Sequence, residues 1–342
     1  MATEGEETMS QAQAMNVKRR QKIDVSQEQI VLGVTAVLFA FFAIRLPGFA
    51  SYGNIITLLN SVAQLGILAL GAAIVVIARG IDLSQIASMA AGAVVTTVAI
   101  QSGHGIAAAM ALGLMASLAV GVVNGLIIAF IEIPALFATL ATNILFYGLL
   151  RGYVQKGQSI AYLPKDATSI IDLGRLRVFD IPISVLIFTV MAVLVHLLLT
   201  RTVLGRFIYA HGDNPEAARL SGVPVRPLTI LEYALSAVVA YVAGILLLST
   251  TLSVDSDIIN STMIFNVILI VVLGGVSLVG GRGGVFSVVA GTLLIGTMLN
   301  GLTIMNVNNL VADMARGAVL MAAILLDNRL HPRNEETARQ GE

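Results

Sequence analysis

The polar side chains that interrupt the long apolar runs of this chain are the residues best suited to chemistry. Asn60 and Gln64 are four residues apart in one such run, so a helix would carry both amides on one face. Such a face can hydrogen-bond a neutral, hydroxylated solute in a hydrated pathway, or it can bond a neighbouring helix. The same two interpretations apply to Asn266 and Asn300, each of which stands alone in its run.

Asp82 and Ser84 follow a glycine at the start of another apolar run. A helix that begins there would use them as N-terminal capping groups, with the aspartate near the positive end of the helix dipole. The alternative is that they are polar groups at the mouth of a pathway. Six residues are therefore candidates for lining a pathway: Asn60, Gln64, Asp82, Ser84, Asn266 and Asn300.

The sequence carries none of the compact motifs that mark an enzyme. Cysteine is absent, which excludes thiolate metal sites and cysteine nucleophiles, and no His-Glu-x-x-His or Gly-x-Ser-x-Gly occurs. The glycine run 280–284 is not followed by Gly-Lys-Ser/Thr, so it is a tight turn rather than a phosphate loop. Asp255 and Asp257 have the spacing of a possible metal pair, but solvated loop carboxylates are the better interpretation. We expect no catalytic residue, metal or cofactor in this chain.

The elements that must position these side chains are membrane-spanning helices. Hydrophobic residues make up 57% of the chain, charged residues only 12%, and the mean hydropathy is +0.89, whereas soluble domains are about one-quarter charged. A span needs ~20 mostly apolar residues, which predicts an all-α integral membrane protein of about ten spans. They fall near 29–46, 55–78, 83–102, 106–130, 135–154, 182–200, 228–250, 262–280, 285–305 and 310–326.

The two halves of the chain resemble each other weakly. Asn124-Gly125-Leu126 recurs 176 residues later as Asn300-Gly301-Leu302, and this offset lays spans two to five on spans seven to ten. An offset of five spans inverts the second copy, which is the five-plus-five inverted repeat of many transporters. Two runs of small residues indicate close helix packing: Gly66, Ala69 and Gly71, and Gly113, Ser117 and Gly121.

The distribution of Lys and Arg predicts the orientation. With both termini in the cytoplasm, thirteen of the 20 cations lie inside and six lie outside, while Arg316 falls within a span beside Asp313. This asymmetry favours a cytoplasmic arm at 1–28, a transmembrane domain at 29–327 and a cytoplasmic tail at 328–342. The formal net charge is zero, so no basic field favours nucleic acid as a partner.

In that orientation the polar connection 201–227 faces the cytoplasm and contains a short capped helix. Asp213 or Asn214 is the N-cap, and Pro215 occupies the first helical position, where its missing N–H costs nothing. Glu216 places a negative charge in the first turn, and Gly222 ends the helix. A helix of about two turns is marginal alone, so it is either an ordinary loop helix or an element that docks on a partner.

The segment 205–223 resembles the cytoplasmic coupling segment of bacterial permeases of the ribose and simple-sugar ABC importer family. Four further blocks resemble the same family, in order along the chain: 80–84, 124–125 with 133–140, 273–283, and 316–317 with 325–327. The resemblance implies that the short helix fits a groove on the ATP-binding subunit. The residues that would form this coupling segment are Gly205, Arg206, Gly212, Asp213, Asn214, Pro215, Glu216, Ala217, Arg219 and Gly222.

The resemblance also implies the partners. They are an ABC ATP-binding subunit that holds ATP and Mg²⁺, a periplasmic sugar-binding protein and a second permease copy in the inner membrane. Two stretches depart from the family pattern, Gln85 to Ala87 and Met263 to Asn266. The amides and hydroxyls of the spans suit a sugar or related polyol.

The alternative is a stand-alone secondary transporter of a small neutral solute. That mechanism needs an ion-coupling carboxylate at the midplane of a span. We expect one only at Asp313, which has Arg316 beside it.

Overall fold

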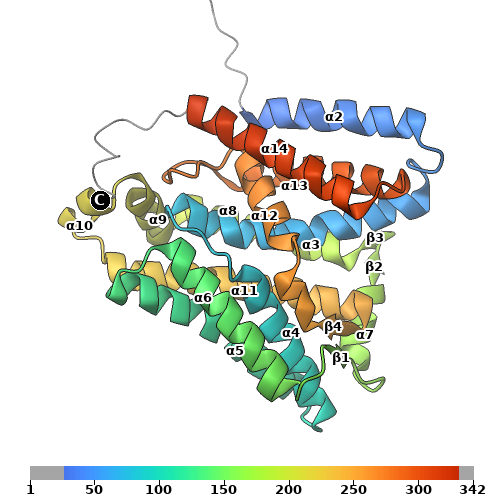
Figure 1. Cartoon of the computed structure of the whole chain (residues 1–342), viewed down its shortest axis with the longest axis horizontal. Helices are drawn as coiled ribbons and strands as arrows, with labels where there is room; N and C mark the ends of the chain where they lie inside the picture. The colour runs from blue at the N-terminus through green and yellow to red at the C-terminus, as the bar shows by residue number, and fades with distance from the viewer. Residues whose placement is uncertain (1–26, 331–342) are drawn as a thin grey trace, which may run out of the picture.

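The computed structural model describes residues 27–330, and nearly all of its elements are helices (Figure 1). The longer helices are α2 (Gln27–Arg45), α3 (Tyr52–Ile77), α4 (Gln85–Gln101), α5 (Ile106–Leu126) continued by η1 (Ile127–Ile131), α6 (Ala135–Leu149) continued by η2 (Leu150–Val154), α8 (Ile183–Arg201), α11 (Val225–Thr251), α12 (Met263–Gly274), α13 (Val285–Ile304) and α14 (Asn309–Leu330). The predicted polar arm and tail fall almost entirely outside the described residues.

Shorter elements fill the connections. They are α7 (Thr168–Arg175), α9 (Val203–Asp213), α10 (Pro215–Leu220) and η3 (Ser256–Asn260). Strand β1 (Ile160–Tyr162) pairs antiparallel with β4 (Ser253–Asp255), and β2 (Arg177–Val178) pairs with β3 (Ile181–Pro182). These strands are only two or three residues long and all other elements are helices, so the predicted all-α fold class is confirmed.

The predicted spans match the longer helices to within a few residues, with one exception. Seven of the described helices are long and apolar enough to cross a membrane, and α4 and α12 are apolar but shorter. The exception is the predicted span 262–280, because α12 already ends at Gly274. Gly275 has a φ of 109°, a left-handed conformation that ends a helix, and the chain then turns into α13.

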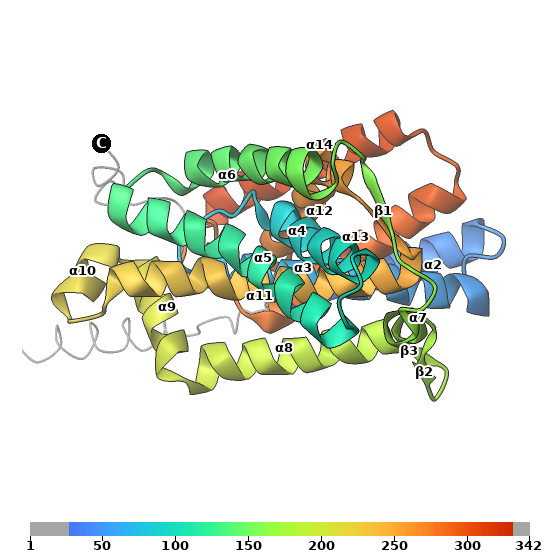
Figure 2. The same ribbon diagram turned by 90° about the horizontal axis from the view of Figure 1, so that it is seen from below.

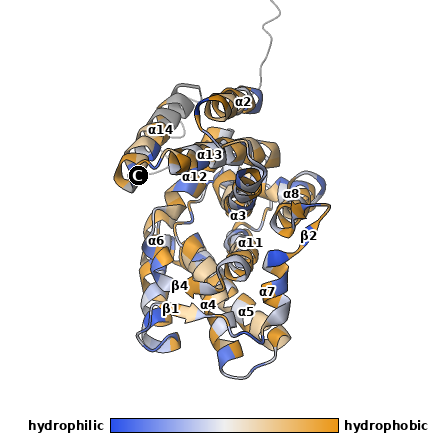
Figure 3. Ribbon diagram, turned by 90° about the vertical axis from the view of Figure 1, so that its right-hand side faces the viewer, coloured by the Kyte–Doolittle hydropathy of each residue, from blue (hydrophilic) through white to orange (hydrophobic). Residues whose placement is uncertain are grey.

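Helices α3 and α11 form the centre of the bundle. Figure 3 looks along the helices and shows α3 and α11 in the middle, with α2, α6 and α8 around them. The two central helices are exchanged between the halves of the chain, because α3 packs against α12 and α13 whereas α11 packs against α4 and α5. Both halves repeat this pattern, as the offset of 176 residues predicts for spans two and seven.

Small residues allow these helices to approach closely, as predicted. A Cβ on Gly113 of α5 would lie 2.4 Å from the carbonyl oxygen of Gly92 in α4. A Cβ on Gly121 would lie 2.4 Å from the carbonyl oxygen of Tyr233 in α11. Between these glycines, the Ser117 hydroxyl donates a hydrogen bond to the Ala237 carbonyl at 2.8 Å. In lipid, helices associate through van der Waals packing rather than the hydrophobic effect, and these small residues let the backbones come into direct contact.

The peripheral helices carry apolar side chains on their outer faces. Val37 of α2 is 72% exposed and Ile144 of α6 is 69% exposed, and Phe137 and Val190 are similarly uncovered. Apolar surface on this scale suits hydrocarbon rather than water. The bundle is therefore built to stand in a bilayer.

The two ends of the bundle differ in construction. In both Figure 1 and Figure 2, helices α9 and α10 lie at one end, and α7 with the strand pairs lies at the other. The first end contains the predicted coupling segment, and the second contains the connection between α6 and α8.

Candidate functional site

The predicted coupling segment forms two consecutive helices rather than one short helix in a loop. Residues 203–213 form α9, which the sequence analysis did not predict, and 215–220 form α10. Thr202 caps α9, since its hydroxyl accepts a hydrogen bond from the Gly205 N–H at 3.0 Å. A Cβ on Gly205 would lie 2.2 Å from the Leu199 carbonyl oxygen, so glycine is needed where α8 bends into α9.

The predicted caps of α10 are confirmed. The Asn214 side-chain oxygen accepts a hydrogen bond from the Ala217 N–H at 3.0 Å, and Pro215 begins the helix. Gly222 has a φ of 85°, and the N–H that follows it, on Val223, donates to the Ala218 carbonyl at 3.0 Å. Asn214 rather than Asp213 is therefore the N-cap, and a Schellman-type turn ends the helix.

Helix α10 presents most of its side chains to solvent. Glu216, Ala217 and Arg219 are exposed, as is Arg206 on α9, and Leu220 is 88% exposed. Ala218 is the buried residue of the helix. Leu220 adds an apolar group that the sequence analysis did not select.

The C-terminal end of α9 is held by backbone contacts with two other segments. A Cβ on Gly212 would lie 1.8 Å from the Ile77 carbonyl oxygen and 2.6 Å from the Gly281 nitrogen. The Gly281 N–H donates to that same Ile77 carbonyl at 2.8 Å, and the Tyr209 hydroxyl donates to the Gly283 carbonyl at 2.8 Å. The glycine turn before α13 therefore braces the coupling segment against the end of α3.

An ionisable pair that the sequence analysis missed lies beside this contact. His211 Nδ1 of α9 is 3.1 Å from Glu232 Oε1 of α11, and the side chain of Glu232 is only 2% exposed. Glu232 lies inside the predicted span 228–250, so Asp313 is not the lone acidic side chain of the spans. The sequence did contain a signal for this pair: an acidic residue inside an apolar run is costly without a partner, so Glu232 predicts one.

A cavity of about 650 Å³ opens next to this pair. Its walls come from the end of α3, the turn between η1 and α6, helix α10 and the start of α11. Arg226 and Glu132, which form an exposed ion pair at 3.3 Å, also line it. This ion pair joins the start of α11 to the turn before α6.

Two of the amides that were predicted to line a pathway form hydrogen bonds with neighbouring helices instead. Asn60 accepts a hydrogen bond from the Ser184 hydroxyl of α8 at 2.5 Å. Gln64 donates to the Thr250 hydroxyl of α11 at 3.2 Å. Although the two amides are one turn apart, they contact different helices.

Asn300 and Asn266 differ in how well their amides are satisfied. Asn300 exchanges two hydrogen bonds with Asn54 of α3, at 2.9 and 3.0 Å. Asn266 is 8% exposed, and its side-chain oxygen has no hydrogen-bond partner among the described residues.

Asp82 and Ser84 lie in a buried polar network at the start of α4. One Asp82 carboxylate oxygen accepts hydrogen bonds from the Ser84 N–H and hydroxyl, at 3.0 and 2.7 Å. The other oxygen accepts from the Ser236 hydroxyl of α11 at 3.0 Å. Asn124 of α5 donates to the Ser84 hydroxyl at 2.5 Å, so this network joins three helices.

One departure from the family pattern joins the same network. Gln85 is fully buried, and its amide donates to the Leu68 carbonyl at 2.8 Å and to the Ser236 hydroxyl at 3.3 Å. The second departure, from Met263 to Asn266, forms the first turn of α12.

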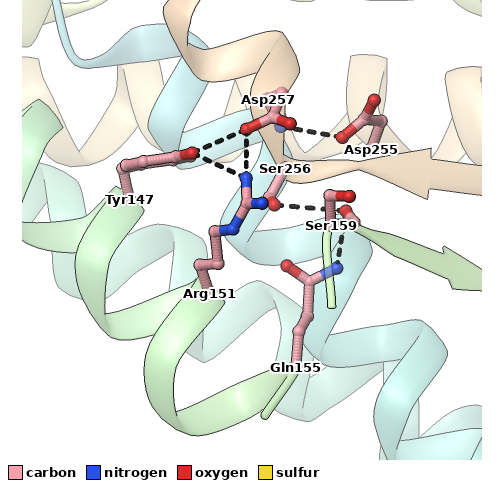
Figure 4. Close-up of polar contacts among 7 residues, drawn as sticks. All are labelled: Tyr147, Arg151, Gln155, Ser159, Asp255, Ser256 and Asp257. Carbon is pink, nitrogen blue, oxygen red and sulfur yellow. Dashed lines mark hydrogen bonds and ion pairs between the residues drawn. The ribbon is translucent and has the colours of Figure 1, made fainter. Parts of the chain in front are cut away.

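At the opposite end of the bundle, α6 is tied to the segment before α12 (Figure 4). Arg151 and the Tyr147 hydroxyl both donate to Asp257, at 2.5 and 2.6 Å. The Tyr147 hydrogen bond, followed by the Arg151 guanidinium, lowers the pKa of the Asp257 carboxyl. Asp257 is thus an ion-pair partner, and the described residues contain no group of three or more His, Cys, Asp or Glu side chains that fits a metal.

The predicted pairing of Asp313 with Arg316 is confirmed, at 2.6 Å within α14. The Asp313 carboxylate is therefore paired with a cation inside the predicted span.

Comparison with known proteins places this architecture in a family. The family model described as "Branched-chain amino acid transport system / permease component" matches residues 54–324. The L-arabinose transport system permease protein of Escherichia coli strain K12 is 35% identical over 297 residues, which cover 87% of this chain and 89% of that protein.

Two ribose import permease proteins are similar over comparable lengths. The one from Escherichia coli strain K12 is 31% identical and covers 88% of this chain and 94% of its own length. The one from Bacillus subtilis strain 168 is 33% identical and covers 86% and 90%. No solved structure gives a significant match. The chain therefore belongs to this family of membrane-embedded permease components, and its relatives include the permeases of ABC importers for arabinose and ribose.

Proposed function

We propose that this chain forms half of the translocation pore of an ABC importer for a sugar or related polyol. The observation that carries the proposal is the similarity to L-arabinose and ribose permeases over 87% and 88% of the chain. The description of the family model names branched-chain amino acids instead. A neutral hydroxylated solute agrees with the uncharged amide of Asn266, whose side-chain oxygen has no hydrogen-bond partner among the described residues.

The energy source in this proposal is a separate ATP-binding subunit that docks on α10. Three properties of α10 support the docking. The helix is capped at both ends, it lies at one tip of the bundle, and it exposes Glu216, Arg219 and Leu220 together. Arginine is enriched in protein interfaces, and Leu220 adds exposed apolar area beside Arg219. ATP and Mg²⁺ belong to that subunit, because the sequence lacks a phosphate loop.

The remaining partners follow from the same assignment. The end with α10 faces the cytoplasm with both termini, and the end with α7 faces a periplasmic sugar-binding protein. A second copy of the chain supplies the other half of the pore. The pathway side chains of this proposal are Asn60, Gln64, Asp82, Ser84, Asn266 and Asn300.

Removing residues 214–222 tests the docking, and uptake of labelled solutes tests the substrate class. We expect the deletion to insert in the membrane but to lose both the co-purifying ATP-binding subunit and uptake. Glu216→Lys should weaken both the co-purification and the uptake.

The full chain should take up a pentose rather than leucine. Uptake should stop when ATP is depleted but persist when ion gradients are collapsed. Normal co-purification after the deletion contradicts the docking, and uptake that follows the ion gradient supports the secondary transporter.

A further inference from the structure

Helix α10 has little direct contact with the bundle. Ala218 is its buried residue, and the cavity of about 650 Å³ separates Pro215 and Arg219 from the turn between η1 and α6. A force applied to α10 cannot pass across an open cavity into α5 or α6. It must instead travel along the chain into α9 on one side or α11 on the other.

Helix α9, in contrast, is firmly packed where it meets α10. Ile208 is fully buried, and Gly212 lies directly against the Ile77 carbonyl and the Gly281 N–H. The Tyr209 hydroxyl reaches the Gly283 carbonyl at 2.8 Å. These contacts connect the last turn of α9 to the end of α3 and to the glycine turn before α13.

Helix α9 also meets α11, both through apolar side chains such as Phe207 and Leu228 and through one pair of ionisable side chains. His211 Nδ1 is 3.1 Å from Glu232 Oε1, with side-chain exposures of 12% and 2%. Removing one member of a buried pair leaves the other without compensation, so separating the two side chains is costly. The pair is therefore a contact that resists separation of α9 from α11.

We propose that His211 and Glu232 are positioning residues that transmit a displacement of α10 into α11. The proposal rests on the docking of the ATP-binding subunit at α10. Helix α11 packs against α3, α4 and α5, and it also carries Thr250, the partner of Gln64. A movement of α11 would therefore change both the helix packing at the centre of the bundle and one of the candidate pathway amides.

The test measures solute transported per ATP hydrolysed in proteoliposomes that contain the permease, its ATP-binding subunit and its binding protein. The single variant His211→Phe leaves Glu232 buried and unpaired, so it tests stability more than transmission. The double variant His211→Phe/Glu232→Leu removes both ionisable side chains, and replacing a buried pair by apolar residues often leaves stability unaffected. We expect the double variant to assemble with the ATP-binding subunit and hydrolyse ATP, while solute transported per ATP falls about tenfold.

The matched control is Glu132→Gln, which breaks the exposed ion pair with Arg226 at the wall of the same cavity. This control should leave solute transported per ATP unchanged. A purely structural role for the buried pair predicts that a folded double variant transports with normal stoichiometry, and that result would overturn the proposal. Failure of the docking itself is recognised separately, because the deletion of 214–222 would then still co-purify the ATP-binding subunit.

Discussion

Among the glycines of the described residues, Gly212 has the least room for a side chain, because three backbone segments meet there. The Ile77 carbonyl accepts a hydrogen bond from the Gly281 N–H at 2.8 Å, and the position of a Gly212 Cβ is only 1.8 Å from the same oxygen. Any side chain would have to push α9 away from both the end of α3 and the glycine turn. The family-like glycines of this region are thus explained by backbone packing and not by binding of phosphate.

Substitution of Gly212 should therefore cost both stability and transport. We expect Gly212→Ala to lower the free energy of unfolding by about 1–3 kcal/mol, the usual range for overpacking. Thermal unfolding of the detergent-solubilised protein and uptake in cells are the measurements. Gly148→Ala in α6 is the control, because a Cβ there meets nothing within 4 Å and alanine favours the helix. Equal stability of the two variants would show that α9 can move away without cost.

Local chemistry made some single residues predictable, and tertiary distance hid others. The caps Asn214 and Gly222 were predictable because capping depends on neighbours a few positions away. Glu232 stands out as an acidic residue inside an apolar run, but its partner was hidden because His211 lies in a different helix, 21 positions earlier. The pairing of Asn54 with Asn300 spans 246 positions, so periodicity within one span carries no information about it.

At the scale of elements, α9 and α10 show opposite balances between local and tertiary stabilisation. Two glycines and several polar residues make 203–213 look like a loop, yet the burial of Ile208 and the packing of Gly212 hold it as a helix. Helix α10 has only six residues and little packing, so it depends on its caps. The predicted span 262–280 failed for a related reason, since hydropathy continues past the glycine where α12 ends.

The cap of α10 should consequently control its order. Asn214→Ala removes the hydrogen bond to the Ala217 N–H and should cost about 1 kcal/mol of helix stability. Hydrogen exchange of the amides in 214–223 should then become about fivefold faster, and less ATP-binding subunit should co-purify. Asn214→Ser keeps a side-chain acceptor and should behave like the native chain. If both variants exchange alike, the cap does not stabilise α10.

At the scale of the whole molecule, the exchange of α3 and α11 makes the two halves of the chain interdependent. Each central helix packs mainly against the helices of the other half, so neither half buries its apolar core alone. Ties at both ends complete the arrangement, with His211 and Glu232 at the α10 end and Arg151 and Asp257 at the other. A change at the α10 end therefore has a continuous packed route to the opposite end.

Such a route matters for transport only if the two ends face opposite sides of the membrane. This topology can be tested with introduced cysteines, because the chain has none of its own to give background labelling. Leu220 of α10 and Phe179, next to β2, are 88% and 95% exposed. We expect Leu220→Cys to react with a membrane-impermeant maleimide in inside-out vesicles freed of the ATP-binding subunit. Phe179→Cys should react in right-side-out spheroplasts instead. Labelling of both from one side would contradict a spanning bundle with these two ends, and the reversed pattern would place α10 outside, where no ATP-binding subunit could reach it.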